Sequence, residues 1–273
     1  MAMIQIVKTI DFEKEPKDLL VVANEELLPK EVFDTLKNQF DTFKKKKFST
    51  VYTLGTIGAS RVHIIGENQF AEEDSFDKVA NNIAGLDEEV LILVDSFKEH
   101  EKAMLDDLVE KVLVKRYSID TFKSKKSDPK PTIYIHGEEV DELVQRGVVF
   151  GESINKAKDL VNTPYNHLNA KDLADYAKEL EKIPGITVHI FEKEAIEDMN
   201  MGAFLGVNKG SSDKPYLIMI HYKKEGNTSD VTALVGKGVM YDTGGYSLKT
   251  PQSMPGMKVD MAGAAAVVSA IEG

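Results

Sequence analysis

The sequence predicts an α/β protein in which strands and helices alternate along the chain. Three observations support this prediction. Short apolar runs typical of strands are separated by longer amphipathic segments with helical spacing. The run Val90–Val94, VLILV, is apolar throughout, as expected for a strand that is buried on both faces. The second half of the chain repeats the same rhythm, which favours layers of helices packed on sheets.

The individual elements follow from these patterns and from the turn residues between them. Strands are expected at Gln5–Thr9, Leu19–Ala23, Thr50–Leu54, Val62–Ile65, Val90–Val94, Thr132–Ile135, Thr187–Phe191, Leu217–His221 and Val231–Val235. Helices are expected at Lys30–Lys45, Ser75–Ala84, Glu99–Val114, Glu138–Leu160, Lys171–Glu181 and Gly263–Ile271.

The predicted organisation is an N-terminal domain at residues 1–137, a linker helix at 138–160 and an incomplete second domain at 161–273. The polar, proline-containing stretch Lys123–Pro131 is expected to be a loop before the linker helix. The chain stops inside the start of an apolar helix, and a domain seldom stops there. We therefore expect the sequence to be a truncated piece of a longer one.

Composition narrows the classes of partner. The 273 residues carry a formal net charge of -11, which argues against a general nucleic-acid or anionic-membrane partner. There are no cysteines, so any metal ion must be held by oxygen or nitrogen ligands. The charged N-terminus does not resemble a signal peptide, and no apolar run approaches the length of a membrane span. These features are consistent with a cytoplasmic protein.

Four residues that could take part in metal binding or catalysis lie in a glycine-rich stretch after the expected strand at Val231–Val235. They are Lys237, Asp242, Lys249 and Asp260. Two carboxylates and two amines close together could bind divalent cations, and a lysine that stays protonated could polarise a carbonyl group. The simpler interpretation is a turn or a phosphate cradle, although the spacing of a P-loop is absent.

Longer motifs in the same region resemble the leucine (cytosol) aminopeptidase family. The stretch GKGVMYDTGGYSLK, followed by Asp260 in MKVDMAGAAAV, is similar to the signature of that family. Ala157–Ala170 (AKDLVNTPYNHLNA) and Met199–Ser211 (MNMGAFLGVNKGS) resemble two further family segments. The resemblance implies a variable, macro-like N-terminal α/β domain followed by the beginning of an α/β aminopeptidase catalytic domain.

The resemblance also implies roles for the four residues. Asp242 would bridge two divalent metal ions, zinc or manganese, while Asp260 and a neutral Lys237 would bind one of them. Lys249 would stay charged and polarise the scissile carbonyl, and a metal-bridging water would attack it. Met257 would line the pocket for the first side chain of the substrate. The implied substrates are peptides with a free N-terminus, and the implied assembly is a homo-hexamer.

One family motif, NTDAEGR, does not occur in the 273 residues. In the family it supplies two more metal-binding carboxylates and an arginine that holds bicarbonate as general base. Because catalysis depends on the whole coordination shell, the resemblance implies an aminopeptidase whose 273-residue portion is inactive on its own or binds metal weakly.

Two other functions remain open at this stage. The N-terminal domain could be a non-catalytic binding module for a nucleotide or DNA, or it could serve oligomer contacts. Gly55–Gly58 (GTIG) is a weak match to a phosphate-binding loop, and a turn is the simpler interpretation. The basic run Lys44–Lys47 could bind an anion, although a solvated helix end is the simpler interpretation. None of the six histidines forms a metal-ligand pair by spacing.

Overall fold

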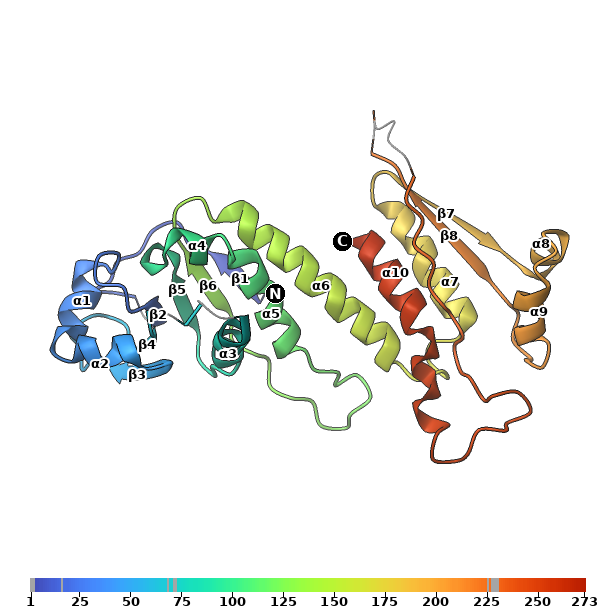
Figure 1. Ribbon diagram of the computed structural model, residues 1–273, viewed down its shortest axis with the longest axis horizontal. Coiled ribbons are helices and arrows are strands. Elements are labelled where there is room, and N and C mark those ends of the chain that lie inside the picture. Colours follow the sequence, from blue (N-terminus) through green and yellow to red (C-terminus); the bar gives the residue numbers. More distant parts are fainter. Residues whose placement is uncertain (1–2, 16, 68, 71–72, 225, 227–230) are drawn as a thin grey trace. The chain divides into compact units, whose positions relative to one another are not determined.

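The computed structural model describes residues 3–15, 17–67, 69–70, 73–224, 226 and 231–273. The chain forms two compact units, Met1–Glu152 and Ser153–Gly273, and the division falls inside a long helix, α6 (Asp141–Asn162). Figure 1 shows the N-terminal unit in blue and green and the C-terminal unit in yellow to red. Each unit is described separately below.

The N-terminal unit is built on a six-stranded sheet with the strand order β1-β6-β5-β2-β4-β3. The strands are β1 (Ile4–Ile6), β2 (Asp18–Val22), β3 (Phe48–Tyr52), β4 (Arg61–Ile65), β5 (Val90–Leu93) and β6 (Ile133–His136). Pairing is parallel except at the edge, where β3 runs antiparallel to β4. Every residue of β2 and β5 is buried, because helices cover both faces of the sheet.

Alternate residues of the central strands point to two separate cores. Leu19 and Val21 of β2 pack on one face with α1 (Lys30–Leu36) and α2 (Phe40–Lys45). Leu20 and Val22 point to the other face, where they pack with α3 (Glu73–Ala84) and α5 (Leu105–Arg116). Because successive side chains of a strand point to opposite faces, the continuous apolar run of β2 is divided between two helical layers.

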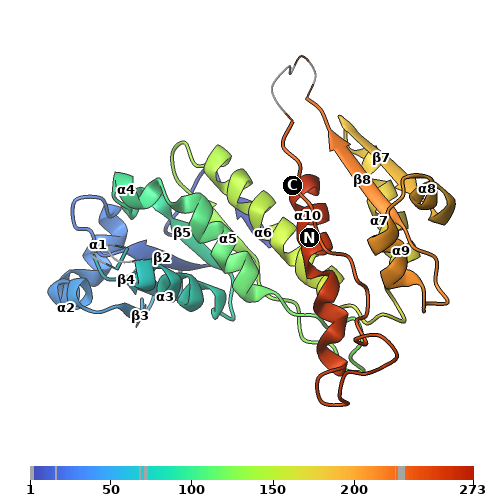
Figure 2. The same cartoon turned by 45° about the vertical axis from the view of Figure 1, so that its right-hand side comes forward.

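The C-terminal unit has a smaller sheet, in which β7 (Ile186–Phe191) and β8 (Leu217–Tyr222) pair antiparallel. Its helices are α7 (Ala170–Glu179), α8 (Lys193–Asp198), α9 (Gly202–Asn208) and α10 (Ala262–Glu272). The views in Figures 1 and 2 both place α7 beside this sheet. Asn169 caps α7 by accepting hydrogen bonds from the backbone N–H groups of Lys171 and Asp172.

The α/β class predicted from the sequence is confirmed. One predicted element is wrong: Val231–Val235 is not a strand in this structure, and Val235 is 94% exposed. An apolar, β-branched run is stable as a strand only when a neighbouring strand takes its hydrogen bonds, and no described strand pairs with it. Two predicted helices are also interrupted. A 3-10 turn at Lys37–Gln39 separates α1 from α2, and α4 (Glu99–Lys102) ends before α5 begins.

Across the described part of the chain, no helix is both long enough and apolar enough to cross a membrane. The Gly55–Gly58 segment connects the antiparallel strands β3 and β4, and Gly55 has a φ of 84°. It precedes a strand rather than a helix, so it is a plain turn without the geometry of a phosphate loop.

Candidate metal centre

The glycine-rich segment that carries the four candidate residues lies against the start of α10. The backbone N–H of Ala264 donates to the carbonyl oxygen of Lys237 at 2.9 Å. A Cβ on Gly236 would come within 2.4 Å of the carbonyl oxygen of Gly263, so only glycine permits this approach. The contact fixes the backbone at Lys237 relative to the 3-10 segment Pro255–Met261 that leads into α10.

Lys237 and Asp260 form the first pair of the site. The Lys237 Nζ lies 3.5 Å from the Asp260 Oδ2, with side-chain exposures of 61% and 24%. Among the described residues this Oδ2 has no hydrogen-bond partner although it is buried. A buried carboxylate oxygen without a partner is destabilising, and a bound cation would supply the missing partner. The atom is therefore suited to ligate a metal ion.

Asp242 and Lys249 form the second pair. The Lys249 Nζ donates to the Asp242 Oδ2 at 2.8 Å, and the backbone N–H of Gly244 donates to the Oδ1, also at 2.8 Å. These two hydrogen bonds, the lysine first, hold the pKa of Asp242 below its ordinary value, and the charge of Lys237 adds to the effect. Asp242 is thus an ionised carboxylate at neutral pH, as a metal ligand must be.

Lys249 has a second neighbour that the sequence singled out. Its Nζ lies 2.8 Å from the Sδ of Met257, which belongs to the 3-10 segment before α10. Between Asp242 and Lys249 the chain turns back through Gly244 and Gly245, with φ values of 80° and 79°. Those values are costly for residues with a side chain, so the two glycines allow Lys249 to fold back onto Asp242.

The structure therefore brings the four candidate residues together as two ion pairs. Their donor set, two carboxylates and two amines, fits part of a site for a hard or borderline divalent cation. The described residues contain no group of three or more histidine, cysteine, aspartate or glutamate side chains that could hold a metal ion. In this arrangement Asp242 accepts a hydrogen bond from Lys249, whereas the Oδ2 of Asp260 is paired with Lys237 at 3.5 Å and has no hydrogen bond among the described residues.

Two supporting contacts were not apparent from the sequence. Gly236 makes room for the backbone at the start of α10. Lys258 donates to the carbonyl oxygen of Asn162 at the end of α6 and anchors the 3-10 segment. The small residues of the run AGAAA at the start of α10 were the available signal, because close backbone approach requires them.

Comparisons with known proteins show what the segment that carries these residues is similar to. Residues 155–273 match the cytosol aminopeptidase family, catalytic domain. The chain is 34% identical over 278 residues to a probable cytosol aminopeptidase of Bacillus subtilis, covering 96% of this chain and 56% of that protein. It is 39% identical over 241 residues to the probable cytosol aminopeptidase of Chlorobaculum tepidum, covering 78% and 48%. The predicted resemblance to the cytosol aminopeptidase family is confirmed.

Solved structures agree with this relationship at the level of fold. A mutant of tomato leucine aminopeptidase matches with a TM-score of 0.71 and 19% identity, over 98% of this chain and 58% of that one. The bottromycin maturation enzyme BotP, solved in complex with Mn, matches with a TM-score of 0.72 and 21% identity, over 94% and 56%. The chain thus spans about half the length of the cytosol aminopeptidases that it matches.

Proposed function

We propose that this chain is the N-terminal portion of a metal-dependent leucyl aminopeptidase, which removes N-terminal residues from peptides in the cytoplasm. The observation that supports the proposal most strongly is the pairing of Lys237 with Asp260 and of Asp242 with Lys249 inside the family signature. In the proposed organisation, residues 1–137 form the N-terminal domain, 138–160 the linker helix and 161–273 the incomplete catalytic domain. The complete protein would assemble as a homo-hexamer.

Each of the four residues has a proposed role. Asp242, Asp260 and a neutral Lys237 would hold the divalent cations, with Asp242 shared between two of them and the other two residues on one. When bound, the cations supply an activated water nucleophile and Lewis acidity. Lys249 is displaced from Asp242, keeps its proton and donates a hydrogen bond to the scissile carbonyl oxygen, where negative charge develops. Met257, which already contacts Lys249, lines the entrance for the first substrate side chain.

We further propose that the 273-residue chain does not catalyse the reaction by itself. The family motif that supplies the remaining carboxylates and the bicarbonate-binding arginine is absent from the sequence. The described residues also contain no cluster of three ligands of the kinds that hold metal ions. Two carboxylates and one amine leave the coordination shell of two cations half filled, so affinity and reactivity would both be low.

The proposal is testable with a chimera in which the C-terminal remainder of the Bacillus subtilis relative follows Gly273. We expect this protein to hydrolyse leucine p-nitroanilide with zinc or manganese and to lose the activity in chelator. The substitutions Asp242→Asn and Lys249→Met should each lower kcat by about a hundredfold or more, the usual effect of removing an electrostatic contact to the transition state. A chimera whose turnover is indifferent to chelator would contradict the proposed chemistry.

The matched control for these variants is Lys209→Met. Lys209 is exposed and lies at the end of α9, outside the four-residue cluster. Its loss should leave kcat and KM unchanged. If Lys209→Met and Lys249→Met lowered turnover equally, the effect would reflect a general change in charge, and the assigned role of Lys249 would be wrong.

A further inference from the structure

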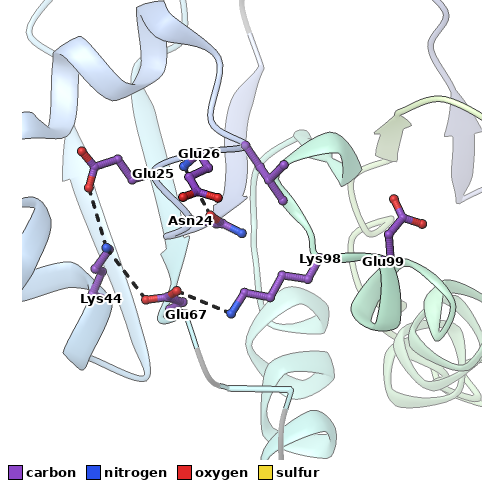
Figure 3. Close-up of a pocket in the computed structure, with 8 residues that line it drawn as sticks. Asn24, Glu25, Glu26, Lys44, Glu67, Lys98 and Glu99 are labelled. Carbon is purple, nitrogen blue, oxygen red and sulfur yellow. Dashed lines mark hydrogen bonds and ion pairs between the residues drawn. The ribbon is translucent and has the colours of Figure 1, made fainter.

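A polar hollow of about 700 Å³ opens in the N-terminal unit, and no role above uses it. It lies where three neighbouring parallel strands end: Asn24 follows β2, Glu67 follows β4, and Lys98 follows β5. Figure 3 shows these side chains with Lys44 of α2, which reaches in from the opposite side. The hollow is lined by Asn24, Glu25, Glu26, Leu27, Lys44, Glu67, Lys98 and Glu99.

The hollow lies at the carboxyl ends of the parallel strands, where open α/β sheets commonly bind ligands. The chain leaving β2 continues into α1 and α2, which pack on one face of the sheet. The chains leaving β4 and β5 lead to α3 and α5, which pack on the opposite face. Connections that diverge from adjacent parallel strands leave a crevice at the carboxyl edge of the sheet. The hollow is therefore a consequence of the topology as well as of the local side chains.

Hydrogen-bond donors in the hollow are incompletely used. Glu67 lies between two lysines, 3.9 Å from the Nζ of Lys44 and 3.4 Å from the Nζ of Lys98. Lys44 is also 3.7 Å from Glu25. All of these separations are long for charge-assisted hydrogen bonds, and an ammonium group carries three donors. Both lysines can therefore donate to an anionic group placed beside Glu67.

The amide of Asn24 adds a neutral hydrogen-bonding group to the charged lining of the hollow. Asn24 is only 8% exposed, and its Oδ1 accepts a hydrogen bond from the backbone N–H of Glu26 at 3.3 Å. Figure 3 shows its Nδ2 turned toward the side of the hollow where Lys98 lies. The amide N–H groups can therefore donate to a ligand that enters the hollow.

The hollow also offers acceptors. Among the described residues, neither Glu26 nor Glu99 has an ion-pair partner, and both lie on its lining. Four carboxylates against two ammonium groups disfavour a polyphosphate or other strongly anionic ligand, because charge repulsion would exceed the attraction. A simple cation would leave the amide of Asn24 and the free donors of the two lysines without partners.

We propose that this hollow binds a small zwitterion of the amino-acid or short-peptide class. The carboxylate of the ligand would accept hydrogen bonds from Lys44, Lys98 and the Nδ2 of Asn24. Its ammonium group would lie against the carboxylate of Glu26, which lies beside Asn24 on the lining. A volume of about 700 Å³ falls within the usual range for small-molecule sites and accommodates a peptide of two or three residues. The inference does not depend on the proposed aminopeptidase activity.

Calorimetric titration of the intact 273-residue chain in chelator tests this proposal, because the chelator removes the cations that the other proposed site requires. The probes are leucine, leucyl-leucine, N-acetyl-leucine and putrescine. We expect saturable binding of leucine or leucyl-leucine, and the comparison of the two distinguishes a free amino acid from a peptide. N-acetyl-leucine lacks the cation and putrescine lacks the anion, so each should bind about tenfold more weakly or worse.

Two variants and a control locate the binding. Lys98→Met and Asn24→Leu should each weaken the affinity about tenfold, the loss expected for one charge-assisted or buried hydrogen bond. Lys47→Met removes an exposed lysine beside the hollow that does not line it, and it should bind as the parent does. The Oδ1 of Asn24 supports a turn, so thermal unfolding is compared for all variants. If Asn24→Leu does not fold, the result for Lys98→Met alone tests the proposal.

Three outcomes would overturn the proposal. They are the absence of saturable binding by either zwitterion, affinity for putrescine or N-acetyl-leucine equal to that for leucine, and unchanged affinity in Lys98→Met. Binding in chelator that follows the Lys98 variant, together with a chimera inactive on leucine p-nitroanilide, would support this site while contradicting the proposed enzyme activity.

Discussion

The two units of the chain treat their apolar residues differently. In the N-terminal unit the central strands β2 and β5 are buried at every position, and helices cover both faces of a six-stranded sheet. In the C-terminal unit the sheet has two strands, and Val231, Leu234 and Val235 remain exposed just before the candidate metal ligands. The strands of the first unit are covered by its own helices, whereas the second unit leaves an apolar run exposed in the same segment as the proposed metal ligands.

This difference shows that the motif that resembles the family signature and the large hydrophobic core lie in different parts of the chain. The motif at Lys237–Asp260 identified the family because its residue types follow from chemistry. The N-terminal unit has the clearer fold, and it lies outside the residues 155–273 that match the catalytic-domain model of the family. Variants in the two units can therefore distinguish residues that stabilise the fold from residues that form the candidate site.

The largest difference in unfolding free energy is expected between an alanine substitution in the core and one just before the motif. Leu91→Ala removes a fully buried side chain from β5 and should lower the free energy of unfolding by about 2–5 kcal/mol. Val235→Ala, at a position 94% exposed, should change it by no more than about 0.5 kcal/mol. Chemical denaturation of both variants measures the difference. A cost for Val235→Ala equal to that for Leu91→Ala would show that the motif segment is buried in solution.

A smaller effect is expected from a methyl group at the contact between the motif and α10. Gly236→Ala would place a Cβ 2.4 Å from the carbonyl oxygen of Gly263 and should cost about 1–3 kcal/mol by overpacking. The matched control, Gly206→Ala in α9, meets nothing within 4 Å and should stabilise the chain slightly, by about 0.4–1 kcal/mol. Thermal unfolding of the two variants should shift in opposite directions, and shifts in the same direction would argue against the contact.

The smallest predicted effect concerns pH and is confined to the N-terminal unit. His63 of β4 is buried, and its Nδ1 lies 2.9 Å from the Oγ1 of Thr50. Burial lowers the pKa of His63 from its ordinary value of 6.5, with the carboxylate of Asp18 opposing the change. The unfolded chain then binds the proton more readily, so stability is present above the ordinary pKa and is lost as pH falls toward the lower folded value.

Hydrogen exchange of the β4 amides between about pH 7 and pH 5 measures this effect, since histidines titrate in that range. His63→Gln should reduce the loss of protection on acidification. His189→Gln, which alters an exposed histidine of β7, should leave the profile of β4 unchanged. An equally steep profile in His63→Gln would assign the acid sensitivity to other groups.

Much of the fold could be predicted because local patterns determine it. Val90–Val94 was recognisable as a buried strand from its apolar run alone, and β5 occupies Val90–Leu93. The same reasoning failed at Val231–Val235, where the apolar run has no strand partner in the described structure. Periodicity identifies a segment that can form a strand, but hydrogen bonds to a neighbour decide whether it does so.

The candidate site could be predicted in residue identity but only partly in arrangement. The hydrogen bond between Asp242 and Lys249 was not predicted, although the glycine turn that allows it is local in the sequence. The packing of Gly236 on Gly263 depends on α10, which is distant in sequence and carries only a weak signal in its small residues. The hollow beside Lys98 was not foreseen, because it depends on the helices after β2 and β5 packing on opposite faces of the sheet.

The central claim is that this chain carries half of a two-cation aminopeptidase site, and one measurement tests it directly. Leucine p-nitroanilide hydrolysis is measured with zinc or manganese for the 273-residue chain and for the chimera completed by the Bacillus subtilis sequence. The account predicts metal-dependent turnover by the chimera and none by the chain alone. Robust metal-dependent turnover by the 273-residue chain, abolished by Asp242→Asn, would contradict it.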